Sequence, residues 1–312
     1  MNVRRLSVST ALLLFSTVAQ AQVQNQRKPS VPPDLVNVSY GPHERNVFDL
    51  WKAKSDRPTP LVIYIHGGGF VAGDKDTVSP FLVDTCLQRG VSVAAINYRY
   101  STQAPYPAPM QDGARAVQFL RLHAQEYNLN PKAFGATGGS AGAGISLWIG
   151  FHDDMAEPAS DDPLKRQSTR LSAMAVGDGQ TTYDPRVIAK LINPETGRHG
   201  ALRTLFSVKQ GEDSLQATEA FPRYEDGSAV THLTADDPPV FLFYSRSSAP
   251  PPPGDLGTGI HHPRFGYFLK EKMDKLGIEC VVKTKDEYEG KTPGQPQRDI
   301  ADFLIKHFPG GE

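Results

Sequence analysis

The sequence predicts an α/β fold with a mostly parallel central sheet and helices on both faces. Apolar runs rich in β-branched residues alternate with helical patterns along the chain, and this order favours parallel strands joined by crossover helices. Continuous apolar runs, for example "PLVIYIH" at 60–66, are typical of strands buried on both faces. The chain has 312 residues, of which 39% are hydrophobic, and this is enough for one large domain of this kind.

The first two predicted strands form an antiparallel hairpin. "LVNVSYG" and "NVFDLWKA" alternate apolar and polar residues on either side of a turn at "GPHER". Core strands are expected further along the chain, at residues 60–66, 91–98, 133–139, 171–177, 238–245 and 278–284. Helical patterns accompany them, at residues 78–89, 108–128, 141–152, 263–276 and 296–308.

Residues 178–237 interrupt this alternation with short helical pieces that contain proline, glycine and charged residues. We interpret them as a small helical insertion above the C-terminal edge of the sheet, where ligands bind in such folds. The proline-rich segment 247–259 follows a predicted core strand, so an extended loop is expected at the same edge. The domain is therefore expected to cover residues 35–312.

The N-terminus resembles a secretory signal peptide at residues 1–21. An arginine pair precedes an apolar run, and Ala19-Gln20-Ala21 is a small-x-small cleavage site. The apolar run at 6–18 is shorter than the roughly 20 residues that span a bilayer, and the arginine pair also permits twin-arginine export. With a flexible leader at 22–34, the mature protein is expected to be exported, and hence periplasmic or extracellular.

The net charge and the two cysteines indicate neither a nucleic-acid partner nor a disulfide. The formal net charge of −1 gives no sign of a nucleic-acid partner. The two cysteines, Cys86 and Cys280, lie in apolar stretches far apart in the sequence. Export would permit a disulfide, but their surroundings favour two buried free thiols.

The segment "GATGGSAGAG" contains the pattern G-x-S-x-G centred on Ser140. It lies between a predicted strand and a predicted helix, the context in which a serine nucleophile stands on a tight turn flanked by glycines. The helix that begins there directs free N–H groups and its positive dipole end at the site. The pattern therefore predicts that Ser140 is a nucleophile.

A second motif, "HGGGF" at 66–70, directly follows the first core strand. Its glycines allow backbone N–H groups to approach a ligand closely. We expect the N–H groups of Gly67 and Gly68, together with that of Ala141, to form an oxyanion hole. His66 is expected to hold the loop rather than to transfer protons.

These motifs, in this order, resemble the α/β-hydrolase fold, and HGGGF with GGSAG resembles the carboxylesterase and hormone-sensitive-lipase-like branch. Between the two motifs, those esterases carry a segment similar to "NYRYSTQAPYPAPMQDGARAVQFLR". The resemblance covers nearly all of the mature chain. It implies a serine esterase in which Arg99 and Asp112 form a structural pair near the sheet edge.

The resemblance also implies a catalytic histidine after the last strand, and this sequence departs from it there. "DEYEGKTPGQ" at 286–295 contains no histidine, and Lys291 is close to where one would fall. The later His307 is near the end of the last predicted helix, which is typical of a partner for the helix dipole. The general base must therefore come from elsewhere, or be missing.

The loop after the next-to-last strand offers candidates for the missing groups. "GDLGTGIHHPRFG" contains Asp255, His261 and His262. Because a base is recognised by geometry rather than by chain position, either histidine could serve, with Asp255 as the acid. The same residues are also typical of a helix entry. Asp178, at the end of another core strand, is a second candidate acid. Two histidines of the insertion, His199 and His232, could line the pocket.

The motifs indicate no metal or cofactor. His261 and His262 are adjacent, which points their side chains in different directions, and no cysteine or carboxylate cluster with zinc spacing accompanies them. The glycine run lacks the lysine of a phosphate loop and the downstream acid of a dinucleotide fold.

Two functions remain open at this point. The first is an exported serine hydrolase that cleaves carboxylic esters, for which fold analogy and export suggest acetyl or feruloyl groups on polysaccharides. Its partner would be a small-molecule or carbohydrate ester. The protein itself is expected to have no membrane span. The second is a binding protein on a hydrolase scaffold that lacks the histidine base.

Overall fold

The computed structural model describes residues 28–310, and its core is an eight-stranded sheet in the order β1-β2-β4-β3-β5-β6-β7-β8. The hairpin pair β1–β2 and the pair β2–β4 are antiparallel, whereas the pairs from β4 to β8 are parallel. The strands are β1 (Leu35–Ser39), β2 (Val47–Trp51), β3 (Thr59–Ile65), β4 (Ser92–Ile96), β5 (Leu129–Gly138), β6 (Ala173–Gly177), β7 (Val240–Tyr244) and β8 (Cys280–Thr284). The predicted hairpin and the predicted core strands are thus confirmed. The predicted signal peptide and residues 22–27 of the predicted leader lie outside the described residues.

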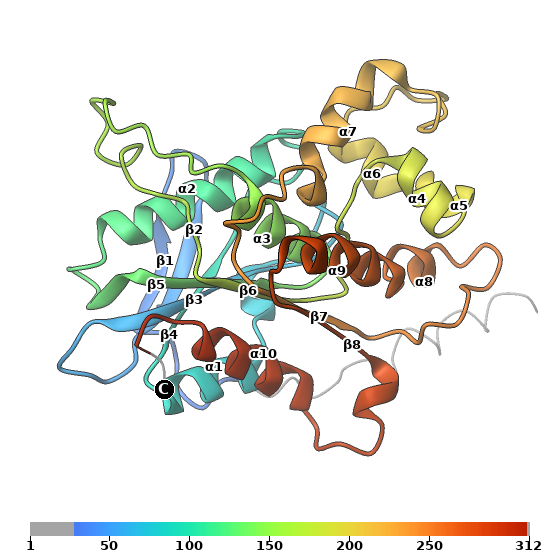
Figure 1. The fold of residues 1–312 in the computed structure, drawn as a ribbon. Coiled ribbons are helices and arrows are strands. Elements are labelled where there is room, and N and C mark those ends of the chain that lie inside the picture. The colour runs from blue at the N-terminus through green and yellow to red at the C-terminus, as the bar shows by residue number, and fades with distance from the viewer. Residues whose placement is uncertain (1–27, 311–312) are drawn as a thin grey trace, which may run out of the picture.

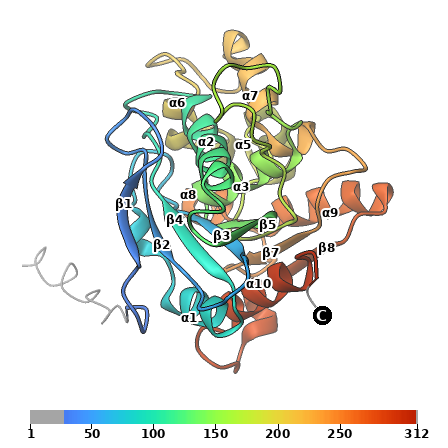
Figure 2. The ribbon, with the colours of Figure 1, turned by 90° about the vertical axis from the view of Figure 1, so that its left-hand side faces the viewer.

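Helices cover both faces of the sheet, as predicted (Figures 1 and 2). α1 (Pro80–Gln88) and α10 (Gln295–Lys306) pack together on one face. The other face carries α2 (Ala108–Leu122), α3 (Ala141–Phe151) and α9 (Arg264–Leu276). Every residue of α3 is buried, because this helix lies between the sheet and the elements outside it.

The segment between β6 and β7 forms the helical insertion, on one side of the molecule in Figure 1. It contains α4 (Pro185–Leu191), α5 (Pro194–Gly197), α6 (Gly200–Leu205), η2 (Thr218–Ala220), α7 (Phe221–Gly227) and η3 (Ala229–Thr231). The proline-rich segment after β7 is less extended than expected, because α8 (Leu256–Ile260) forms at its end. Two further 3-10 helices are η1 (Lys75–Thr77) and η4 (Lys285–Tyr288).

The structure meets two structural expectations from the sequence. The Arg99 guanidinium binds the Asp112 carboxylate with both Nε (2.8 Å) and Nη2 (2.7 Å). Cys86 and Cys280 are free and buried, and burial raises the pKa of each thiol to about 12. Among the described residues, none of the helices has both the length and the hydrophobicity required to cross a membrane.

Candidate active site

The two glycine motifs meet because of the strand register. Ile65, the last residue of β3, pairs with Gly138, the last residue of β5, so the loops that follow these parallel strands leave the sheet side by side. Ser140 stands on the turn from β5 into α3 with φ 52° and ψ −116°. A positive φ is uncommon for a residue with a side chain, and such strain is typical of a nucleophile on a strand-to-helix turn.

The tightness of this turn predicts different effects for two neighbouring glycines. A Cβ on Gly142 would lie 2.0 Å from the backbone oxygen of Ile65, whereas a Cβ on Gly139 would meet nothing within 4 Å. Gly142→Ala should therefore lower the free energy of unfolding by at least about 2 kcal/mol, because backbone must shift. Gly139→Ala, the matched control, should unfold at the wild-type urea midpoint. Equal midpoints for the two variants would contradict this account of the turn.

His261 is the histidine that contacts the predicted nucleophile. Its Nε2 lies 2.9 Å from Ser140 Oγ, and its Nδ1 lies 2.9 Å from the backbone oxygen of Gly257. Because a carbonyl oxygen only accepts, Nδ1 carries the proton, and Nε2 is left as the acceptor for the serine hydroxyl. This is the tautomer that a general base requires.

His262 has a structural role instead. It is fully buried, its Nε2–H donates to the Ala249 backbone oxygen (2.9 Å), and its Nδ1 accepts from the Arg264 N–H (3.1 Å). Burial lowers its pKa, so the ring stays neutral where α8 meets α9. With both nitrogens engaged, His262 is not available to Ser140, and the geometry selects His261 from the pair.

Neither candidate carboxylate is hydrogen-bonded to His261. Asp255 caps α8 by accepting from the N–H (2.9 Å) and Oγ1 (2.6 Å) of Thr258. Asp178 accepts from the N–H (2.8 Å) and Oγ (2.7 Å) of Ser245. Among the described residues, no carboxylate is hydrogen-bonded to His261, and the Gly257 carbonyl takes the position of the acid. The sequence offers no signal for this partner, because it is a backbone atom.

The capping role of Asp255 yields a direct test. Asp255→Asn keeps a side-chain oxygen for the cap and removes the charge, so kcat/KM should stay close to the wild-type value. A catalytic aspartate of a triad, in contrast, loses about 10⁴-fold in kcat on this substitution. Steady-state hydrolysis of p-nitrophenyl acetate measures the difference. A loss of that size would show that Asp255 acts as the catalytic acid.

The glycine loop supplies free N–H groups beside Ser140. Gly68, Gly69 and Ala141 line the same cavity as Ser140 and His261. Within residues 28–310, none of these three N–H groups donates a hydrogen bond to a backbone oxygen. The predicted donor Gly67 does not line the cavity, and its carbonyl accepts from His66 Nδ1 (2.7 Å). Gly69, which the sequence analysis did not name, lines the cavity and is therefore a further candidate donor.

Comparison with known proteins places the chain in a family. The model of the BD-FAE family matches residues 48–249. The chain belongs to the BD-FAE family. The matched residues include the glycine loop and Ser140 but end before His261, so the candidate base lies in a segment that the match does not cover.

Relatives of this BD-FAE protein carry hydrolase names. The chain is 29% identical over 217 residues to the "probable carboxylic ester hydrolase LipM" of Mycobacterium tuberculosis, covering 68% of this chain and 48% of that protein. It is 27% identical to a "probable isoprenylcysteine alpha-carbonyl methylesterase" of Arabidopsis thaliana, covering 82% and 50% of the two chains. The chain thus spans about half the length of these curated relatives.

Solved structures confirm the α/β-hydrolase fold. A carbohydrate esterase from gut microbiota superposes with a TM-score of 0.64 at 19% identity, covering 88% of this chain and 95% of the other. An acetyl ester-xyloside bifunctional hydrolase from Caldicellulosiruptor lactoaceticus gives a TM-score of 0.63 at 18% identity, covering 83% and 87%.

His66 holds the glycine loop of this BD-FAE protein in place, as expected. The His66 ring stacks on Tyr98, with centroids 4.3 Å apart, and its Nε2 accepts from Arg45 Nη2 (3.1 Å). Burial lowers the pKa of His66 to about 4. The ring therefore remains neutral near pH 7, with its proton on the nitrogen that donates to Gly67.

The cavity over Ser140 has a volume of about 330 Å³. The insertion supplies much of its wall, including the apolar side chains of Tyr183, Ala201 and Leu202. His199 also lines it, and burial, followed by the nearby His261, lowers the pKa of His199. His232, the other histidine expected near the pocket, is not among the lining residues.

Proposed function

We propose that this BD-FAE protein is a serine hydrolase that cleaves carboxylic esters through an acyl-enzyme. The observation that carries the proposal is the 2.9 Å contact between Ser140 Oγ and His261 Nε2. His261 thereby provides a base, although the segment after β8, where related esterases carry the histidine, has none. The esterase names of the relatives and the free N–H groups beside Ser140 support the same reaction.

In the proposed reaction, Ser140 Oγ attacks the ester carbonyl carbon while His261 Nε2 takes the hydroxyl proton. The N–H groups of Gly68, Gly69 and Ala141 stabilise the negative charge that develops on the carbonyl oxygen, and one such donor is worth about 3 kcal/mol. The imidazolium returns its proton to the leaving alcohol. Water then attacks the acyl-enzyme by the same route and releases the acid.

The Gly257 carbonyl holds the correct tautomer of His261 but carries no negative charge. It therefore stabilises the imidazolium less than a carboxylate does. We expect slower turnover than in an enzyme with a complete Ser-His-Asp triad. The alternative function, a binding protein without a base, is disfavoured because an imidazole lies within hydrogen-bond distance of Ser140.

The pocket and the names of structural neighbours support a proposal for the substrate class. A cavity of about 330 Å³ with an apolar wall suits a small acyl group on a larger, protruding alcohol. Structural neighbours are named for carbohydrate ester and acetyl ester hydrolysis. We propose that the substrates are acyl groups on polysaccharides, above all acetyl groups. We also propose that the protein is exported, since polysaccharides of this kind lie outside the cell.

Pre-steady-state hydrolysis of p-nitrophenyl acetate tests the proposed reaction. An acyl-enzyme that deacylates slowly gives a burst of p-nitrophenol of one equivalent per chain before the linear phase. Release of acetate from acetylated xylan then tests the substrate class separately. Turnover no faster than in buffer, in both assays, would contradict the proposed function and favour the binding protein.

A further inference from the structure

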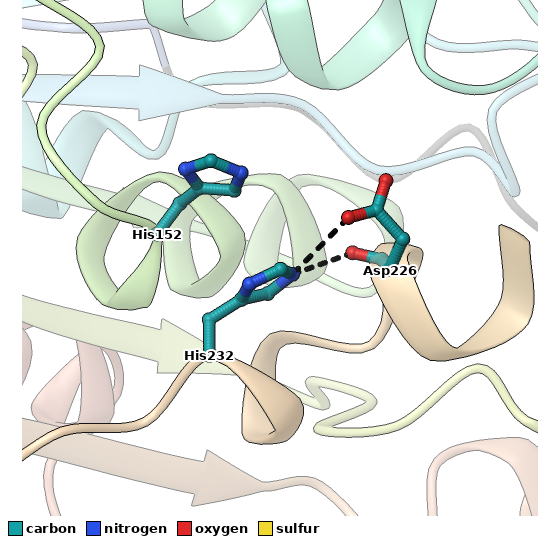
Figure 3. A group of neighbouring side chains, drawn as sticks. All are labelled: His152, Asp226 and His232. Atoms are coloured by element: carbon teal, nitrogen blue, oxygen red, sulfur yellow. Dashed lines mark hydrogen bonds and ion pairs between the residues drawn. The ribbon is translucent and has the colours of Figure 1, made fainter. Parts of the chain in front are cut away.

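A second group of reactive side chains lies at the far end of α3 from Ser140. His152, the residue that caps the C-terminus of α3, meets Asp226 of α7 and His232 at the end of η3. One ligand atom from each lies within 4.8 Å of the others. Figure 3 shows the two imidazole rings and the carboxylate facing one another across a small space. With a rise of 1.5 Å per residue, the length of α3 separates this cluster from the nucleophile by about 16 Å.

The geometry of the cluster suits a metal ion. The His152 Nδ1–H donates to the Asp153 backbone oxygen (3.1 Å), so Nε2 is the nitrogen with a free lone pair. Histidines that bind metals use such a bond to fix the tautomer of the ring. The two rings lie close together, with centroids 4.7 Å apart.

A hydrogen bond from a neighbouring side chain also orients the carboxylate of Asp226. Its Oδ2 accepts from the Tyr106 hydroxyl, which leaves Oδ1 turned toward the histidines, 3.9 Å from His232 Nε2. Its backbone oxygen accepts from Trp148 Nε1 (2.9 Å) and from His232 Nε2 (2.7 Å). The carboxylate thus has one oxygen held by a neighbour and one available as a ligand.

We propose that His152, Asp226 and His232 bind a divalent transition-metal ion, with Zn²⁺ as the best match to two imidazoles and one carboxylate. On binding, the proton of His232 moves from Nε2 to Nδ1, and the ion replaces the hydrogen bond to the Asp226 carbonyl. Ligand atoms around tetrahedral zinc lie roughly 3.3–3.5 Å apart, since the bonds are about 2.0–2.2 Å long. The side chains must therefore approach by about 1 Å, which the exposure of Asp226 and the half-buried position of both rings permit.

The site would connect two parts of the fold. His152 belongs to the buried core helix, whereas Asp226 and His232 belong to the insertion that forms the wall of the catalytic cavity. A bound ion would tie the insertion to α3 and stabilise the folded state by mass action. Sequence spacing could not indicate this site, because His152 is far along the chain from the other two residues.

Titration of the metal-free full chain with ZnCl₂ by calorimetry tests the proposal. We expect one Zn²⁺ per chain and a higher melting temperature in its presence. His152→Gln and His232→Gln should each weaken Zn²⁺ affinity by at least about 100-fold. The matched control is His123→Gln. His123 lies at the C-terminus of α2, forms a hydrogen bond with Glu126 (2.8 Å), and is not part of the cluster.

A second readout separates ligation from general stability. Co²⁺ added to the metal-free chain should give the visible absorption of a four-coordinate site, and this band should disappear in the His152 and His232 variants while their circular dichroism stays native. Absence of Zn²⁺ binding, or binding that both variants retain, would overturn the proposal. The proposal would also be overturned if His123→Gln lost as much binding as the two ligand variants. The same holds if the wild type lost its native circular dichroism on metal removal and did not recover it when Zn²⁺ was added.

Discussion

Ser140→Ala is expected to lower kcat/KM for p-nitrophenyl acetate by about 10⁴-fold or more, the largest effect of any single substitution in this chain. The variant loses the atom that forms the acyl-enzyme, so the initial burst should vanish as well. The N–H donors and the cavity remain, and they can sustain a residual rate above that in water. Steady-state and stopped-flow assays measure both quantities.

Ser172→Ala is the control for Ser140→Ala. Ser172 lies just before β6, where its hydroxyl donates to the Lys132 backbone oxygen (3.2 Å), at the opposite end of the sheet from the nucleophile. This variant should keep the wild-type burst. A Ser140→Ala protein that retains wild-type turnover would contradict the assignment of the nucleophile.

His261→Ala is expected to lower kcat/KM by about 10²–10⁴-fold, the usual contribution of a general base. Ser140→Ala and the double variant should be equally slow, because the two residues act as a unit. The adjacent histidine provides the contrast. His262→Gln should lower the melting temperature, because it disturbs the buried bond to Ala249, but it should leave the rate per folded molecule near the wild-type value.

The opposite pattern would contradict the assignment of the base. If His262→Gln removed activity from folded protein and His261→Ala did not, the 2.9 Å contact to Ser140 Oγ would not be catalytic. Circular dichroism of each variant establishes which molecules are folded before the rates are compared.

The elements of the fold were predictable because each depends on local pattern. β3 and β6 are continuous apolar runs in the sequence, and such runs are typical of buried parallel strands. The turn that carries the proposed nucleophile was predictable for a related reason, since its close approach to Ile65 admits only glycine at position 142. Local sterics of this kind leave a direct mark on the sequence.

The proposed base could not be chosen from the sequence, because the choice depends on how one short helix is placed. His261 and His262 are consecutive, and only the rotation of α8, anchored by Gln180 Nε2 on the Ile260 carbonyl (2.7 Å), turns the first toward Ser140. Asp255 looked like an acid because it stands near the expected position, yet its carboxylate is used by the cap of α8. The Gly257 carbonyl has no side-chain signature at all.

Covalent labelling tests most directly whether a hydroxyl activated by an imidazole stands in this pocket. The wild-type chain and the His261→Ala variant are incubated with a fluorophosphonate probe, and the adduct is located by peptide mass spectrometry. The account predicts one adduct per wild-type chain, on Ser140, and much slower labelling of the variant. An adduct on another residue, or equal labelling rates in the two proteins, would contradict it.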